Sequence, residues 1–115
     1  MIEQTVRDYL GNLLSVPVHT EVPINPPSSF VVIEKTGGSS VNHISTNTLA
    51  IQSYAESMYL ASLLNEEVKD AMENIITLNS ISRCSLEGDY NYTDTRTKQY
   101  RYQAVYEITY KRMED

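Results

Sequence analysis

The segment Tyr100-Arg101-Tyr102-Gln103-Ala104-Val105-Tyr106-Glu107-Ile108-Thr109-Tyr110 carries the clearest fold signal in the chain. Its even positions are tyrosine or aliphatic, whereas its odd positions are mainly polar, with Val105 as the exception. Successive side chains of a β-strand point to opposite faces of the sheet. The segment therefore predicts a long strand with one face packed and the other in water.

Working back along the chain, the sequence predicts more strands separated by turns. Residues 81–87 give a weak strand signal, and the polar residues 88–97 are typical of a turn region. Residues 44–54 are rich in Thr, Ile and Leu, and the β-branched run at 30–35 is typical of a strand buried on both faces. Gly and Ser at 36–40 predict a flexible loop between these two strands, which are expected to pair antiparallel.

Two helices complete the expected elements. In residues 2–14 apolar side chains, Leu13 among them, recur at helical spacing and predict one core-facing stripe. A longer helix of about five turns is expected over residues 58–75. Ser53 begins a capping-box pattern before it, and Ser57 is another possible N-cap.

The element order predicts the fold class. Four prolines limit the region after the first helix to a short extended piece at 18–22 and a loop. The order is then α-β-β-β-α-β-β, which indicates an α+β fold: an antiparallel β-sheet packed by two helices, in a single domain over residues 1–115. A chain of 115 residues is long enough to bury a core without cross-links, and Cys84 has no partner for an internal disulfide.

Composition excludes some classes of function. The formal net charge of −6 disfavours general adhesion to nucleic acid, which needs a surplus of Lys and Arg. No apolar run is as long as a membrane span, so no membrane association is expected. Nine tyrosines, against one Phe and no Trp, favour contact surfaces, because tyrosine stacks broadly while its hydroxyl stays hydrated.

No residue pattern predicts chemistry. His19 and His43 have no Cys, His or carboxylate at metal-ligand spacing, and Cys84 reads as a small buried hydrophobe. The glycine-serine stretch at 36–40 lacks the lysine and the following helix of a phosphate-binding loop. We therefore expect no catalytic, metal or cofactor residues, and a protein that is not an enzyme.

Charge is distributed unevenly along the chain. The outer face of the long helix is acidic with two apolar members, while six of the nine basic residues follow position 80. We hypothesise that the basic hairpin of one copy meets the acidic helix face of the next, closing a ring. The candidate subunit-interface residues are Tyr59, Leu63, Glu66, Asp70, Glu73, Arg83, Arg96, Lys98 and Arg101. Alternatively, these charges only keep a monomer soluble.

With these elements placed, the chain resembles the tail-terminator and tail-completion (head–tail joining) proteins of long-tailed phages (siphophages), in versions found in phages and prophages of Gram-positive bacteria. The resemblance covers essentially the whole chain. Besides the opening helix, its segments are Val16-Pro17-Val18, Glu21-Val22-Pro23, Phe30-Val31-Val32-Ile33-Glu34-Lys35-Thr36-Gly37-Gly38, Leu49-Ala50-Ile51-Gln52-Ser53-Tyr54-Ala55 and Tyr100-Arg101-Tyr102-Gln103-Ala104-Val105-Tyr106-Glu107.

The resemblance implies a structural virion protein without an active site or cofactor. Such a protein forms a ring, commonly a hexamer, that terminates the tail tube and joins it to the head connector. Its partners would be further copies of itself, the tail tube protein and the head connector protein, and DNA would pass through without specific binding. It would be assembled in the host bacterial cytoplasm and be located at the head-proximal end of the tail in the virion.

The resemblance also directs attention to two polar segments as docking loops, because flexible hairpin tips often carry interfaces. The candidate docking residues are Gly37, Gly38, Ser39, Ser40, Asn42, His43, Asp89, Tyr90, Tyr92 and Asp94. Two alternatives stay open. One is another head–tail connector or minor capsid component. The other is a small non-catalytic α+β module that binds a ligand or peptide.

Overall fold

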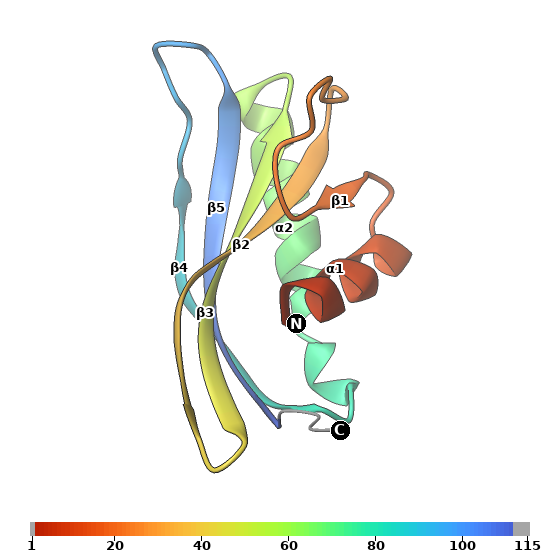
Figure 1. Cartoon of the computed structure of the whole chain (residues 1–115). Helices are drawn as coiled ribbons and strands as arrows, with labels where there is room; N and C mark the ends of the chain where they lie inside the picture. The colour runs from red at the N-terminus through yellow and green to blue at the C-terminus, as the bar shows by residue number, and fades with distance from the viewer. Residues whose placement is uncertain (1, 112–115) are drawn as a thin grey trace.

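The computed structural model describes residues 2–111, which form two α-helices, a short 3₁₀ helix and a five-stranded, mostly antiparallel sheet (Figure 1). The predicted α+β class and the predicted element order are confirmed. Along the chain the elements are α1 (Ile2–Leu13), β1 (Val18–His19), β2 (Phe30–Val41), β3 (Ile44–Ala55), α2 (Met58–Met72), η1 (Ile75–Thr77), β4 (Ile81–Asn91) and β5 (Tyr100–Lys111).

The strands are arranged in the order β1-β2-β3-β5-β4. The four long strands alternate in direction, because β2 with β3, β3 with β5 and β5 with β4 are all antiparallel pairs. The short β1 runs parallel to β2 and pairs with Val31 and Val32. Beyond Val32 the outer edge of β2 is therefore open in the described sheet, and β4 forms the opposite open edge.

Both helices lie on one face of the sheet, where they form a single apolar core. Helix α1 buries Ile2, Val6 and Leu10, and β5 contributes Ala104, Tyr106 and Ile108, so the predicted alternation is confirmed over residues 104–108. It is wrong at Gln103, which is buried on the face expected to lie in water. Leu13, in contrast, is 58% exposed, so its predicted core position is wrong. The residues that α1 buries are spaced four apart, and this narrow ridge leaves Leu13 outside the contact.

Helix α2 begins at a side-chain cap. The Ser57 Oγ accepts a hydrogen bond from the Leu60 amide at 3.1 Å, so Ser57 is the N-cap. The capping box expected from Ser53 is wrong, because Ser53 is a fully buried residue of β3. The helix ends at Met72, earlier than the predicted residue 75, and the 3₁₀ helix η1 follows it.

The glycine-serine stretch predicted as a flexible loop is the second half of β2. It pairs with β3 as far as Val41, and Asn42 and His43 form a two-residue turn with φ of 52° and 66°, the signature of a type I′ hairpin. Gly38 is required here, because a Cβ on it would lie 1.9 Å from the Asn47 Oδ1. Tertiary pairing with β3 thus overrides the weak strand propensity of Gly and Ser.

The sheet face opposite the helices has a smaller cluster of its own. Phe30 stacks on Tyr54 with ring centroids 4.5 Å apart, and Val32 packs beside them. The predicted burial of this strand on both faces is confirmed for residues 30–33. Next to the cluster, the buried Gln52 Nε2 donates to the Gln103 Oε1 at 2.8 Å, so even the polar members of this face are paired.

Candidate assembly interface

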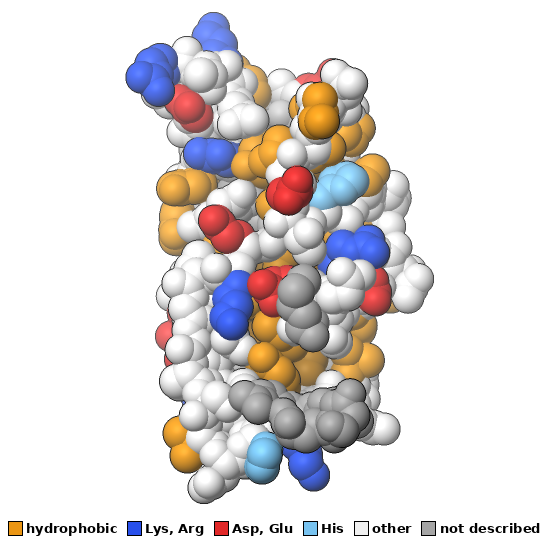
Figure 2. Space-filling model, in the orientation of Figure 1, with side chains coloured by type: hydrophobic (Ala, Val, Ile, Leu, Met, Phe, Trp, Pro, Cys, Tyr) orange, Lys and Arg blue, Asp and Glu red, His pale blue; other side chains and the backbone are white. Residues whose placement is uncertain are grey.

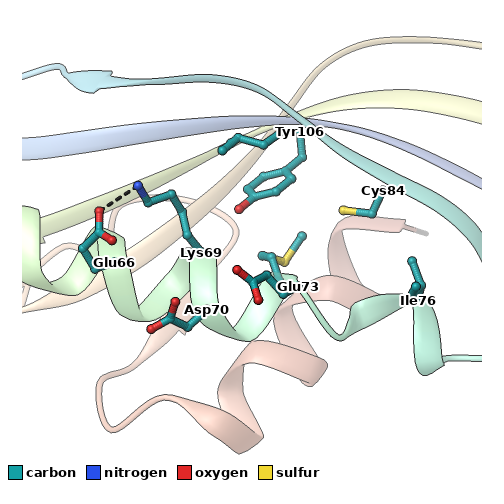
Figure 3. A pocket seen from close by; sticks show the side chains of 9 residues that line it. Glu66, Lys69, Asp70, Glu73, Ile76, Cys84 and Tyr106 are labelled. Atoms are coloured by element: carbon teal, nitrogen blue, oxygen red, sulfur yellow. Dashed lines mark ion pairs between the residues drawn. The ribbon is translucent and has the colours of Figure 1, made fainter.

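Helix α2 and the edge strand β4 enclose a groove of about 490 Å³, called here the α2–β4 groove (Figure 3). Figure 3 shows the Tyr106 side chain reaching from the sheet toward the helix. The floor is apolar and aromatic, formed by Met72, Ile76, Cys84, Leu86 and Tyr106. The rim is charged and comes from α2, through Glu66, Lys69, Asp70 and Glu73.

The groove is electrically negative. The Lys69 Nζ lies 2.7 Å from a Glu66 carboxylate oxygen and also contacts Asp89, so its charge is already compensated. The side chains of Asp70 and Glu73 make no ion pair or hydrogen bond with any residue from 2 to 111. Two carboxylates therefore face the groove without a cation.

The floor of the groove is uncharged at neutral pH. Burial raises the pKa of the Cys84 thiol to about 11 and raises the pKa of the Tyr106 hydroxyl above its ordinary value. Cys84 is thus a neutral, partly buried thiol, as expected from the sequence. The groove combines a neutral apolar floor with an anionic rim, an arrangement that favours an aliphatic stem ending in a cation.

A polar network ties β4 to α2 beside the groove. Asn65, which is 1% exposed, donates from Nδ2 to the Asp89 Oδ1 at 2.7 Å, and the Lys69 Nζ contacts the Asp89 Oδ2 at 2.5 Å. The hydrogen bond from Lys69 holds the pKa of Asp89 below its ordinary value, and the same contact raises the pKa of Lys69. The edge strand is therefore held against the helix by a charged contact.

The structure brings the acidic half of the predicted interface together on one face of α2. Spacings of four and three residues align these side chains along the helix. All five are exposed, including Tyr59 at 70% and Leu63 at 43%, and three of them form the rim of the α2–β4 groove. We call this set the acidic stripe: Tyr59, Leu63, Glu66, Asp70 and Glu73.

The basic half of the predicted interface is dispersed. Arg96 and Lys98 lie in the connection between β4 and β5, where Figure 2 shows Lys and Arg side chains gathered at the tip of this hairpin. Arg83 is exposed on β4 and pairs with Thr109, on the sheet face away from the groove. The basic residues thus form no single surface.

Arg101 makes its contacts within the chain. Its guanidinium lies over the Tyr92 ring, 4.5 Å from the centroid, and its Nε donates to the Tyr92 carbonyl oxygen at 2.8 Å. Its Nη1 donates to the Tyr54 hydroxyl at 3.1 Å. These contacts give Arg101 a role within the fold, joining β5 to β3 and to the hairpin tip.

The basic hairpin tip is the connection between β4 and β5, at the edge of the sheet that β4 forms. Three members of the acidic stripe line the α2–β4 groove at the same edge. A head-to-tail contact requires two patches on different sides of a subunit. The expected contact between the acidic stripe and the basic hairpin tip stays a prediction. Because both lie at the β4 edge, a cation at the β2 edge is better placed to meet the stripe of a second copy.

The structure places most of the candidate docking residues in strands, not in loops. Gly37 to Ser40 belong to β2, and Asp89 and Tyr90 belong to β4, so their expected loop conformation is wrong. Pairing with the long strands β3 and β5 explains both extensions. Asn42 and His43 do form a hairpin turn, and Tyr92 and Asp94 lie in the β4–β5 connection. Their role in docking stays a prediction.

Asp94 shapes the basic tip of the second hairpin. Its Oδ1 accepts hydrogen bonds from the backbone amides of Arg96 at 3.1 Å and Thr97 at 3.4 Å. The hydrogen bonds from Thr97 are the main reason why the pKa of Asp94 lies below its ordinary value. The connection therefore has a defined turn, in which Lys98 takes a positive φ of 57°.

Two features of this surface have no local signal in the sequence: the unpaired Lys35 at the edge of β2 and the α2–β4 groove. Lys35 lies on the open stretch of β2, and no local pattern distinguishes it from other surface lysines. The groove requires α2 to lie beside β4, a contact that becomes visible only in three dimensions. The signal that did exist was the acidic stripe, which forms the groove's rim.

Among residues 2–111, no cluster of three or more His, Cys, Asp or Glu side chains is arranged to hold a metal ion. Neither described helix has the length and apolar character needed to cross a membrane. The sequence matches no protein-family model and no curated protein.

Proposed function

We propose that this chain is a structural protein of a tailed phage that assembles head to tail into a ring, terminates the tail tube and joins it to the head connector. The resemblance described above supplies the phage context. The observation that carries the ring is the pair of unlike open edges, β4 on one side of the sheet and the outer half of β2 on the other.

Strand direction makes these two edges compatible. The strands β2, β3, β5 and β4 alternate in direction, so β2 and β4 run antiparallel to each other. A second copy in the same orientation would place its β2 against β4 of the first and continue the antiparallel order. Unpaired backbone groups at both edges would then be hydrogen bonded. Repetition of one such contact closes a ring when the rotation between copies divides a full turn.

The helices lie on one face of the sheet, and this arrangement suggests which face of each copy points toward the channel of the ring. Both described α-helices cover one face of the sheet, and neither lies on the other face (Figure 1). The bulkier helical layer needs the longer, outer circumference, so we place the open face toward the channel. That face carries Thr46, Thr48 and Glu107 on the central strands and Arg83 on β4. Hydroxyl groups and charges of both signs suit a wall along which DNA passes without specific binding.

Measuring the oligomeric state tests this proposal. Native mass spectrometry across a concentration series should show one dominant species at an integral multiple of the 13.1 kDa chain mass, above the dimer. Electron micrographs of the same sample should show ring-shaped particles. A 13.1 kDa species at every concentration, or a dimer that grows no further, would contradict the ring.

The α2–β4 groove favours one of the alternatives, a small module that binds a peptide. A groove with an apolar floor beside an unpaired strand edge is a geometry in which extended peptides bind by strand addition. A monomer that binds basic extended peptides in the groove would support this alternative. A neighbouring connector protein would also form rings, and micrographs showing rings on heads but not on tail tubes would favour it.

A further inference from the structure

Lys35 is an uncompensated cation on the open edge of β2. Its side chain is exposed and makes no ion pair or hydrogen bond with any residue between 2 and 111. It lines the same hollow as Asn47 and Tyr110, which places it on the helix side of the sheet. Lys35 thus projects from the edge opposite β4, on the face that also carries the α2–β4 groove.

The strand register relates Lys35 to that groove. Lys35 pairs with Leu49, Leu49 pairs with Tyr106, and Tyr106 pairs with Leu86. These four residues form one row across the sheet. Lys35 is at its β2 end, while Tyr106 and Leu86, at its β4 end, belong to the floor of the groove.

We propose that Lys35 of one copy enters the α2–β4 groove of the adjacent copy and pairs there with Asp70 and Glu73; this inference rests on the head-to-tail ring. If the sheet continues from copy to copy without stagger, the row continues as well, and Lys35 lies beside Leu86 of its neighbour. A shift of two residues toward the start of β4 keeps Lys35 on the same face and brings it beside Cys84, within the groove. In the other direction, the irregularity between Leu86 and Gly88 makes Asp89, three residues on, the next residue on that face.

Both charge and shape favour Lys35 as the residue that binds in the α2–β4 groove. Among the described residues, the Asp70 and Glu73 carboxylates of the groove pair with no cation, and Lys35 on the open part of β2 pairs with no anion. The lysine stem would cover the apolar floor while its ammonium group reaches the rim. Arg96 and Lys98 at the hairpin tip lie on the same side of the molecule as the groove, so a sheet that continues from copy to copy does not bring them to it.

Charge reversal and rescue test the contact. Lys35→Glu, and separately Asp70→Lys combined with Glu73→Lys, should each raise the concentration at the midpoint of assembly about tenfold, the equivalent of about 1.4 kcal/mol per interface. Combining the two sets of changes in one chain should restore assembly toward the wild-type midpoint. Glu67→Lys is the matched control, since this residue does not line the groove, and it should leave the midpoint unchanged. Lys98→Glu tests the alternative contact through the hairpin tip and should have a smaller effect than Lys35→Glu.

The outcomes separate this inference from the ring itself. If the wild-type chain never assembles, the ring proposal fails. If it assembles but Lys35→Glu has no effect, or Lys98→Glu has the larger effect, the ring stands and the Lys35 contact is wrong.

A carbodiimide cross-link provides a second measurement on the unaltered chain, because this reagent joins an amine directly to a carboxylate in contact with it. In mixed isotope-labelled and unlabelled rings, peptides joining Lys35 of one copy to Asp70 or Glu73 of another are expected. Inter-chain cross-links to the groove that exclude Lys35 would overturn the inference.

Discussion

The two edge strands of the sheet, β2 and β4, differ in how they are supported. Strand β4 is tied to α2 through Asp89 and Lys69, and the acidic stripe follows it along the helix. Among residues 2–111, the outer half of β2 pairs with β3 alone and carries Lys35, whose side chain makes no ion pair with any of these residues. The two edges of the sheet are therefore unlike: unpaired carboxylates lie beside β4, and an unpaired cation lies on β2.

The largest expected effect on the subunit itself is at the β2 edge. Gly38→Ala should lower the free energy of unfolding by about 2 kcal/mol, because the new methyl group would displace the buried Asn47 side chain. Asn47 would then lose its 2.7 Å hydrogen bond to the Tyr110 hydroxyl. Urea denaturation measures the change.

Gly37→Ala is the matched control, one residue away in the same strand. A Cβ on Gly37 has no atom within 4 Å. Its unfolding free energy should stay within about 0.5 kcal/mol of the wild type. Equal losses in the two variants would show that the outer half of β2 is not held in this register.

At the β4 edge, Asp89→Asn should cost about 1 kcal/mol at neutral pH, a value reduced by the partial exposure of the contact with Lys69. The pKa of Asp89 is depressed in the folded protein, so its stabilising contribution is present above the ordinary carboxyl pKa of 3.8 and is lost as the pH falls through the lower folded value. The difference between wild type and variant should therefore shrink in acid.

Denaturation at a series of pH values, at concentrations where the chain is monomeric, measures this dependence. Asp70→Asn is the control, because the Asp70 side chain has no partner among residues 2–111 and its loss should leave monomer stability nearly unchanged. A wild-type advantage over Asp89→Asn that persists at pH values well below 3.8 would contradict the ion-pair account.

The smallest expected effect concerns the tip of the hairpin that contains β4. Arg101→Lys should cost about 0.5–1 kcal/mol, because lysine keeps the charge but loses the planar contact with the Tyr92 ring. Tyr92→Phe keeps an aromatic ring under Arg101 and should cost less. The reverse order of the two variants in thermal denaturation would indicate that stacking does not hold the tip.

The same comparison shows what the sequence could reveal. Strand β5 was predictable because the alternation over residues 100–110 is a local pattern, and the acidic stripe was predictable because helical spacing aligns its members. The second half of β2 was not predictable, since Gly and Ser have weak strand propensity and only the pairing with β3 makes them extended. The end of β4 was missed for a similar reason, because β5 and the contact from Asp89 to α2 hold it.

The candidate interface also has one part that the sequence predicts and one part that it does not. The stripe of α2 could be read from the sequence as a surface, but the groove beneath it depends on Leu86 and Tyr106, which the sheet brings to α2. The basic residues after position 80 stand out in the sequence, whereas the proposed role of Lys35 depends on the strand order. Order in a sheet is set by contacts between distant segments, so no local pattern reports it.

Amide hydrogen exchange, compared between dilute monomer and assembled protein, tests the proposed head-to-tail ring. A head-to-tail ring predicts that assembly protects two separate segments in every copy, β4 and the part of β2 beyond Val32, while the inner strands β3 and β5 change little. Protection of one edge alone would indicate a two-fold contact between identical strands, and protection of neither would show that the edges do not join; either result would contradict the ring described here.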